Sequence, residues 1–263
     1  MTTIEAIILG LTQGLTEFIP VSSSGHLVLL HQAMGITENG LTFDVALHIG
    51  TLGALVLYFC KDIVLLIQGI LGRNEYKRVA WLIALATIPA VIAGMVLQGS
   101  AESAFRSTRL VAVNLIAVAL LMLAAEAFAK RYKHKAGLKE ISWKQALAVG
   151  IAQGAAIVPG VSRSGGTITT GLFMGIDRVA ATRFSFLLGI PITAGAIVKV
   201  LATGESAHMM GQETGLFVVG IVTALVSGLF AIKFLLKYLS GHTLAAFAYY
   251  RIGLGLLVLL VTL

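Results

Sequence analysis

Residues 13–26 read QGLTEFIPVSSSGH, and they interrupt an otherwise apolar segment near the beginning of the chain. A proline and three adjacent serines break the helical pattern, and a carboxamide, a carboxylate and an imidazole accompany them. At membrane depth such a break is tolerated only where protein or a water-filled cavity covers the freed backbone groups. The stretch therefore predicts a loop buried inside a protein that is otherwise built from apolar helices.

The composition around this stretch is typical of a membrane protein. Of the 263 residues, 57% are hydrophobic and 12% are charged, whereas a soluble domain carries about 25% charged residues. Several segments approach the roughly 20 apolar residues that span a bilayer. They lie at about 43–60, 79–99, 109–129, 184–201, 214–232 and 244–263. We therefore expect an all-α polytopic membrane protein.

The opening stretch has a counterpart 140 residues later. Residues 10–36 align with 150–176 without a gap, and ten of these 27 positions are identical, among them Gln13/Gln153, Ser22/Ser162 and Gly25/Gly165. This is far above chance and indicates an internal duplication. Each half then consists of one broken apolar segment followed by three continuous ones.

The distribution of charge predicts how the two halves are oriented. Most Lys and Arg residues lie between the spans at 61–78, 130–144, 178–183 and 233–237, whereas the loops 100–108 and 202–213 contain three glutamates and one arginine. By the positive-inside rule the first group is cytoplasmic, so the net charge of +7 reflects topology and predicts no nucleic-acid partner.

This orientation requires each broken segment to enter and leave the membrane on the same side. We therefore predict an inverted-topology repeat, in which each half has one re-entrant helical hairpin and three transmembrane helices. The chain would form a single integral membrane domain over 1–263. Its repeats, approximately 1–130 and 144–263, would be joined by a basic cytoplasmic loop.

The duplicated loops differ in the residues that carry chemistry. Arg163 occupies the position of Ser23, and the positions of Glu17 and His26 hold Ile157 and Gly166. An arginine at membrane depth is costly and marks a candidate functional site. Its planar fork suits phosphate oxygens, although Arg163 could instead serve only as a structural partner of Glu17. The glycines and serines around it resemble an anion cradle that opens a helix, which makes Ser162, Ser164 and Gly165 candidate phosphate ligands.

In the first loop, hydroxyls precede an imidazole at helical spacing. If SSSGHLVLL opens a helix, Ser22 and Ser23 share a face with His26, which is an arrangement of nucleophile and base. The alternative is helix capping by serine, which is common.

Glu17 lies one helical turn after Gln13, so the two could hold a divalent cation such as Mg²⁺ or Ca²⁺, with substrate oxygens completing its coordination shell. Alternatively, Glu17 could orient His26 or act as a base.

Other polar residues inside apolar segments have less definite roles. Asp44 and His48 could extend the site or pair with each other. Arg251, in the stretch YYRIG, is a second intramembrane cation that would contact a diphosphate or pair with Asp44. Glu126 lies near a span end, where we expect its carboxylate to reach the polar surface.

Three motifs resemble the bacterial undecaprenyl-diphosphate phosphatase family of the bacitracin-resistance type. They are QGLTEFIPVSSSGH, FDVALHIGTLGAL and PGVSRSGGTITTG. The resemblance covers essentially the whole chain. Some family members carry a glutamate at the position of Gln13, which leaves Glu17 as the one carboxylate of this motif.

The resemblance implies hydrolysis of undecaprenyl diphosphate to undecaprenyl phosphate, which recycles the lipid carrier of cell-wall precursors. It also implies a divalent metal and an active site that faces the outer side of the bacterial cytoplasmic membrane. We expect Glu17, Ser23, His26 and Arg163 to be catalytic and Glu17 to contribute to the metal site. The expected substrate ligands are Gln13, Ser22, Ser24, Ser162, Ser164, Gly165 and Arg251.

Our mechanistic hypothesis is that Ser23 attacks the terminal phosphorus with His26 as its base. His26 itself as nucleophile, or direct activation of water, remain alternatives. A transporter or flippase of an anionic lipid is the competing function, because inverted repeats with broken helices also suit alternating access. The glycines of the last span could support a homodimer.

Overall fold

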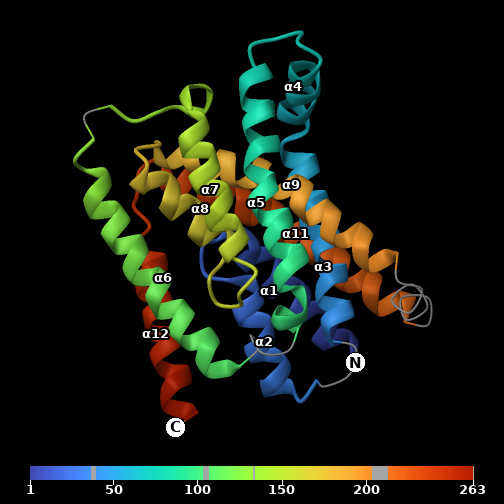
Figure 1. The fold of residues 1–263 in the computed structure, drawn as a ribbon. Coiled ribbons are helices and arrows are strands. Elements are labelled where there is room, and N and C mark those ends of the chain that lie inside the picture. The colour runs from blue at the N-terminus through green and yellow to red at the C-terminus, as the bar shows by residue number, and fades with distance from the viewer. Residues whose placement is uncertain (37–39, 103–106, 133, 203–212, 263) are drawn as a thin grey trace.

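A computed structural model describes residues 1–36, 40–102, 107–132, 134–202 and 213–262. The described residues are mostly helical (Figure 1). They are α1 (Thr3–Phe18), α2 (Ser23–Met34), α3 (Gly40–Tyr58), α4 (Cys60–Ile70), α5 (Lys77–Glu102), α6 (Thr108–Ala129), α7 (Trp143–Ala155), α8 (Arg163–Phe173), α9 (Arg178–Leu201), α11 (Thr214–Leu239) and α12 (Ala245–Val261), with a 3₁₀ turn at Leu138–Glu140.

The continuous apolar segments of the sequence all lie on helices. Within the described residues, α5, α6, α9 and α11 are long and apolar enough to cross a membrane, and α3 and α4 meet the same criterion only together, across a bend of 78°. The shorter apolar helix α12 has 17 residues. The prediction of an all-α polytopic membrane protein is confirmed. The helix α4 is an addition, because we predicted no element for the segment between the spans 43–60 and 79–99.

The two broken segments form helical hairpins, α1–α2 and α7–α8, that point toward each other from opposite ends of the molecule (Figure 1). Both breaks have the same backbone geometry. Ser22 and Ser162 have φ angles of 78° and 75°, and they are the non-glycine residues with positive φ in the described part of the chain. Each is the N-cap of the second helix, and its hydroxyl accepts the amide of Gly25 or Gly165. The duplication therefore extends to backbone conformation.

Packing of the hairpins also follows the duplication. Each hairpin packs its first helix on the second span of the other half: α1 lies on α11, and α7 lies on α5. Gly10 and its counterpart Gly150 permit both approaches, because an added Cβ would lie 2.6 Å from the Gly220 oxygen and 2.3 Å from the Ala86 oxygen. Small residues of this kind let membrane helices approach closely. The equivalent helices α3 and α9, and α6 and α12, also pack together, which is consistent with an inverted repeat.

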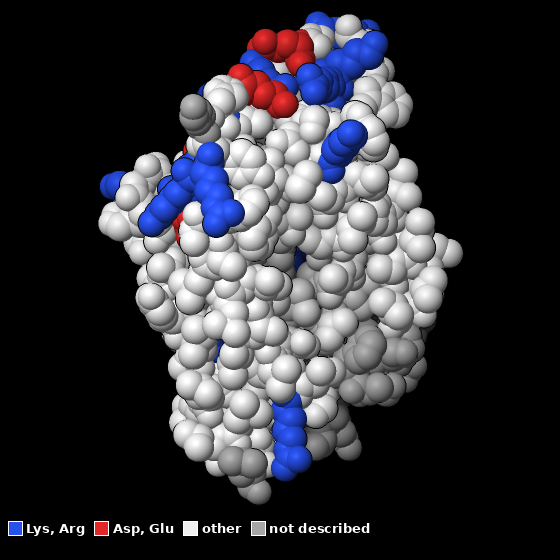
Figure 2. Space-filling view, turned by 60° about the vertical axis from the view of Figure 1, so that its left-hand side comes forward, with Lys and Arg blue, Asp and Glu red and all other residues white. Residues whose placement is uncertain are grey.

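Charged residues gather at the end of the molecule where α4 lies, and the middle of the face in Figure 2 is largely uncharged. Two ion pairs stabilise this end. Arg178 binds Glu126 at 2.6 Å, and Arg183 binds Asp62 at 2.6 Å. Glu126 also accepts the amide of Leu244 at 2.9 Å, so it joins α6, α9 and the start of α12. Our expectation that Glu126 reaches the polar surface is wrong, because its side chain is only 7% exposed.

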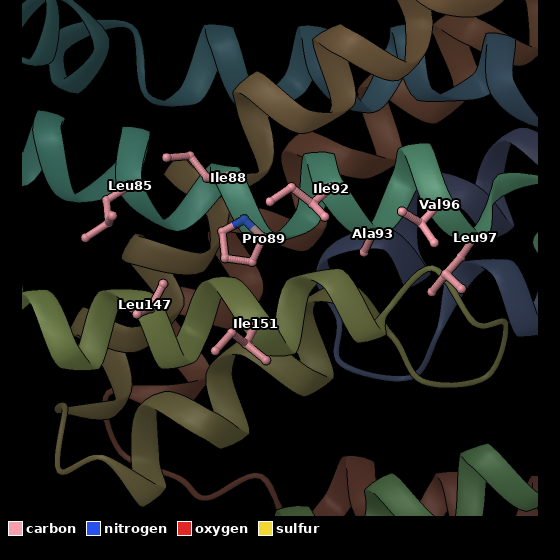
Figure 3. A pocket seen from close by; sticks show the side chains of 9 residues that line it. All are labelled: Leu85, Ile88, Pro89, Ile92, Ala93, Val96, Leu97, Leu147 and Ile151. Carbon is pink, nitrogen blue, oxygen red and sulfur yellow. The ribbon is translucent and has the colours of Figure 1, made fainter.

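An apolar groove of about 580 Å³ runs between α5 and α7. Ile88 and Ile92 of α5 and Ile151 of α7 are among the side chains that line it (Figure 3). These three side chains are more than half exposed, although isoleucine is usually buried in the interior of a protein. Such a surface is suited to contact with lipid chains, which are as apolar as the side chains themselves.

Candidate active site

The site forms where the two hairpin tips meet, around the carboxylate of Glu17 in the last turn of α1. Arg163 Nη2 donates to Glu17 Oε1 at 2.7 Å, and Ser23 Oγ donates to Glu17 Oε2 at 2.6 Å. Gln13 Nε2 donates to the same Oε2 at 3.1 Å. Four predicted residues from both halves are thus in contact. The carboxylate is almost fully buried, so its charge depends on these donors and on the guanidinium.

In this arrangement only part of the hydrogen-bonding capacity of the Arg163 guanidinium is used. It is the first residue of α8, and its side chain is 16% exposed. Its Nη1 is buried and has no hydrogen-bond partner. The guanidinium lies against Gly189 of α9, where an added Cβ would be 1.5 Å from Nη1. Because buried donors are normally paired, this N–H group is suited to bind an oxygen of a ligand.

The imidazole of His26 does not face the hydroxyl of Ser23. Its Nδ1 lies 2.7 Å from the carbonyl oxygen of Ser22, and its Nε2 lies 2.8 Å from the hydroxyl of Tyr250. A carbonyl only accepts, so Nδ1 carries the proton and Nε2 is the acceptor in the neutral ring. The expected hydrogen bond from serine to histidine is therefore replaced by one from Ser23 to Glu17.

The other serines of the two loops build the backbone turns. Ser22 and Ser162 cap α2 and α8 and are buried. Their hydroxyls lie 3.4 Å from Ser24 Oγ and 3.3 Å from Ser164 Oγ, respectively. The amide of Gly165 is already used by the Ser162 cap at 3.0 Å. These groups shape the rims of the site, and Ser24 is the more exposed of the two following serines.

Arg251 lies behind the loops and is fully buried. Its guanidinium donates to Gly160 O at 2.6 Å, Val161 O at 3.2 Å and Pro20 O at 3.2 Å. Pro20 and Gly160 are equivalent positions of the duplication. The carbonyls of Asn114 and Leu115 on α6 accept as well. This geometry favours a role in holding both loops together over the substrate contact or the Asp44 pair that we expected.

Asp44 and His48 separate into different environments. Asp44 Oδ1 lies 2.7 Å from Nε2 of His31 on α2, so the expected side-chain pair with His48 does not form. His48 Nδ1 instead bonds the Asp44 carbonyl at 2.8 Å, and its Nε2 lies 3.8 Å from Glu17 Oε2. His48 therefore borders the site. Sequence reasoning missed His31 and Tyr250, because neither has a local pattern that predicts its long-range partner.

The side chains of the site provide few ligands for a metal ion. Within the residues that the structure describes, no group of three or more His, Cys, Asp and Glu side chains is placed to hold one. Gln13 Oε1, however, is buried and has no partner, and its own amide nitrogen contacts Glu17. One amide oxygen and one carboxylate fit a hard divalent cation only if substrate oxygens supply most of its ligands.

Fold and site together define an integral membrane protein with a polar site between two helical hairpins. The chain belongs to the bacitracin resistance protein BacA family, whose model matches residues 6–257. It is 43% identical to an undecaprenyl-diphosphatase of Rubrobacter xylanophilus, with 97% of this chain and 96% of the relative covered. Relatives of the same name from Pelotomaculum thermopropionicum and Methanosphaera stadtmanae are 41% and 40% identical, over 98% of this chain and 96% and 98% of their own lengths.

Proposed function

We propose that this protein is an integral membrane phosphatase that hydrolyses undecaprenyl diphosphate to undecaprenyl phosphate and inorganic phosphate. This activity recycles the lipid carrier for cell-wall synthesis and confers bacitracin resistance. The observation that carries the proposal is the contact of a hydroxyl, a carboxylate and a guanidinium in one buried site. Relatives named undecaprenyl-diphosphatase that align over nearly the whole chain support the same activity.

The first step of the proposed reaction uses the three groups in contact. The terminal phosphate binds the free Nη1 of Arg163, which lies at the start of α8 where a helix favours anions. Ser23 Oγ attacks the phosphorus and passes its proton to Glu17, the acceptor that it already contacts. The bond from phosphorus to the bridging oxygen breaks, and undecaprenyl phosphate leaves. Arg163 stabilises charge on the transferring group, which is the main catalytic task in phosphoryl transfer.

Arg163 also explains how Glu17 becomes an effective base. In the structure the guanidinium is shared with the carboxylate, which stabilises its ionised form and weakens it as a proton acceptor. A phosphate that draws the guanidinium toward itself relieves Glu17 of part of this interaction. The carboxylate then accepts the serine proton more readily.

The second step removes phosphate from Ser23 by attack of water. We assign His26 to this step, because its Nε2 is the acceptor end of the ring and lies at the exposed edge of the site. A divalent cation, Mg²⁺ or Ca²⁺, would be held by Gln13 Oε1 and Glu17 and would neutralise charge on the phosphate oxygens.

The site would face the outer side of the bacterial cytoplasmic membrane. A homodimer would form through α12, where Gly253 leaves its outward face open.

The test is phosphate release from undecaprenyl diphosphate by purified protein in detergent, where no second compartment exists. Ser23→Ala, Glu17→Gln and Arg163→Lys should each lower kcat by about 100-fold or more, as expected for loss of a group that acts in the transition state. Ser240→Ala, which changes an exposed serine at the end of α11, should retain full activity. Radioactive phosphate should be trapped on Ser23 after a rapid quench.

Two results would contradict the proposal. Full activity of Ser23→Ala would exclude the serine as nucleophile, and the wild-type protein binding the lipid without releasing phosphate would favour a transporter. Chelation of divalent ions should remove activity, and addition of Mg²⁺ or Ca²⁺ should restore it if a cation takes part.

A further inference from the structure

Tyr250 reaches the site from α12, a helix of the second half. Its hydroxyl lies 2.8 Å from His26 Nε2, and its ring stacks on the imidazole with centroids 5.7 Å apart and planes at 6°. The phenol is 49% exposed. The contact therefore lies at the mouth of the site and couples the second half to the histidine of the first loop.

The two hydrogen bonds of His26 fix the state of its ring. The carbonyl of Ser22, at 2.7 Å, requires a proton on Nδ1. In the neutral ring Nε2 then has a lone pair, and the Tyr250 hydroxyl must donate to it. The opposite tautomer would bring a lone pair on Nδ1 against a carbonyl oxygen, which is repulsive. Tyr250 thus favours a neutral imidazole whose acceptor nitrogen points toward the mouth.

The duplication provides a second, independent observation. Shifting by 140 residues places Gly166 at the position of His26, so the second loop has no counterpart of this histidine. The structural residues of the same regions persist, since Ser22 and Ser162 keep one geometry. His26 therefore belongs with the residues that make the site asymmetric, namely Glu17 and Arg163, and Tyr250 contacts this histidine directly.

We propose that Tyr250 is a positioning residue for the phosphatase reaction, acting through His26. Its hydroxyl and ring hold the imidazole so that Nε2 points to the edge from which water enters. When the phosphorylated serine forms, a water takes the place of the tyrosine hydroxyl at Nε2 and gives its proton to that nitrogen as it attacks phosphorus. The P–Oγ bond breaks, Ser23 Oγ takes back the proton held by Glu17, phosphate leaves, and His26 loses its proton to solvent. The inference rests on the proposed phosphatase function.

The neighbouring Tyr249 offers a matched control. It is 63% exposed on the same helix, and Tyr249→Phe removes a hydroxyl one residue away. Tyr250→Phe keeps the ring stack and removes only the hydrogen bond. We expect Tyr250→Phe to lower kcat about five- to tenfold with KM within twofold, the size expected for one hydrogen bond. Tyr249→Phe should leave both constants within twofold of wild type.

A double-mutant cycle tests whether Tyr250 acts through His26. In a His26→Ala background, Tyr250→Phe should cause no further loss, because coupled residues are not additive. An equal loss in both backgrounds would overturn the inference, and so would wild-type kcat in Tyr250→Phe. A rise in KM alone would mean that the tyrosine binds substrate and does not position the histidine.

A measurement without turnover separates this inference from the proposed function. In protein labelled with ¹⁵N at histidine, the His26 resonances, assigned by their loss in His26→Ala, should show protonated Nδ1 and unprotonated Nε2. Tyr250→Phe should shift the Nε2 resonance, and Tyr249→Phe should not. An unshifted resonance would refute the contact whether or not the protein hydrolyses the lipid, whereas inactive wild-type protein with the expected shift would refute only the phosphatase.

Discussion

Arg163 shows how single residues decide the geometry of the site. A buried arginine and carboxylate must compensate each other's desolvation, and removing one partner of such a pair costs about 3–5 kcal/mol. Arg163 binds Glu17 through Nη2, and its Nη1 has no hydrogen-bond partner. The pair is therefore stable enough to form and still has binding capacity for an anion. A lysine has one charge centre and cannot serve both partners in this way.

Gly189 is predicted to be required for this placement of the guanidinium. In Gly189→Ala the new Cβ would collide with Nη1 at 1.5 Å, and the flexible arginine would swing away from Glu17. We expect kcat/KM for undecaprenyl diphosphate to fall at least about tenfold, since one positioned donor contributes more than that. The midpoint of thermal unfolding in detergent should fall, because the buried carboxylate of Glu17 loses its charge partner.

Gly195→Ala on the same helix is the control, because nothing lies within 4 Å of its added Cβ. It should keep wild-type kcat/KM. If Gly189→Ala also keeps wild-type kcat/KM, the observed position of Arg163 has no role in the reaction.

At the scale of elements, Arg251 of α12 joins the two loops and α6. It donates to equivalent carbonyls of both breaks, at Pro20 and Gly160. Main-chain groups freed by the breaks would otherwise be buried without partners, at a cost of about 1–3 kcal/mol each. One arginine with its planar set of donors satisfies several of them at once. The two duplicated loops thus both depend on one residue of the second half.

Arg251→Met should therefore disturb folding before it disturbs substrate affinity. We expect a clear drop in the midpoint of thermal unfolding and loss of activity, because the carbonyls lose their donors. Arg109→Met is the matched control, since Arg109 donates to Thr262 O at 2.8 Å in an exposed contact. Unchanged unfolding of Arg251→Met with a raised KM would instead assign the arginine to the substrate.

At the scale of the whole molecule, the inverted arrangement makes a prediction about sidedness. Cys60 is the single cysteine of the chain and is exposed, and it lies at the bend between α3 and α4 beside Lys61. It belongs to the basic end, which should be cytoplasmic. A membrane-impermeant maleimide should label Cys60 in inside-out vesicles and leave it unlabelled in intact cells.

A Cys60→Ser, Gly215→Cys variant gives the reciprocal test. Gly215 is exposed at the start of α11, and nothing lies within 4 Å of an added Cβ. This cysteine should react in intact cells. Labelling of Cys60 from outside, or of both positions from one side, would exclude the proposed topology.

Local pattern alone determined much of this protein. The apolar lengths predicted the spans, and the match of residues 10–36 with 150–176 predicted two hairpins with equal breaks. The expectation that Glu17 and Arg163 come together followed from this duplication, because both lie on corresponding loops. These features depend on local hydrophobicity, backbone preference and repetition, which neighbouring residues in the chain specify directly.

Tertiary structure alone decided which atoms meet. Spacing in the first loop suggested that Ser23 would face His26, but Ser23 contacts Glu17 and His26 contacts Tyr250. Asp44 likewise bonds His31 in place of His48. Such contacts depend on the rotation and crossing of helices that are far apart in the chain, where a shift of one residue turns a side chain by about 100°. The sequence alone determined that the polar groups lie on the two loops at the helix breaks. Only the packing of the two halves decided which donor meets which acceptor.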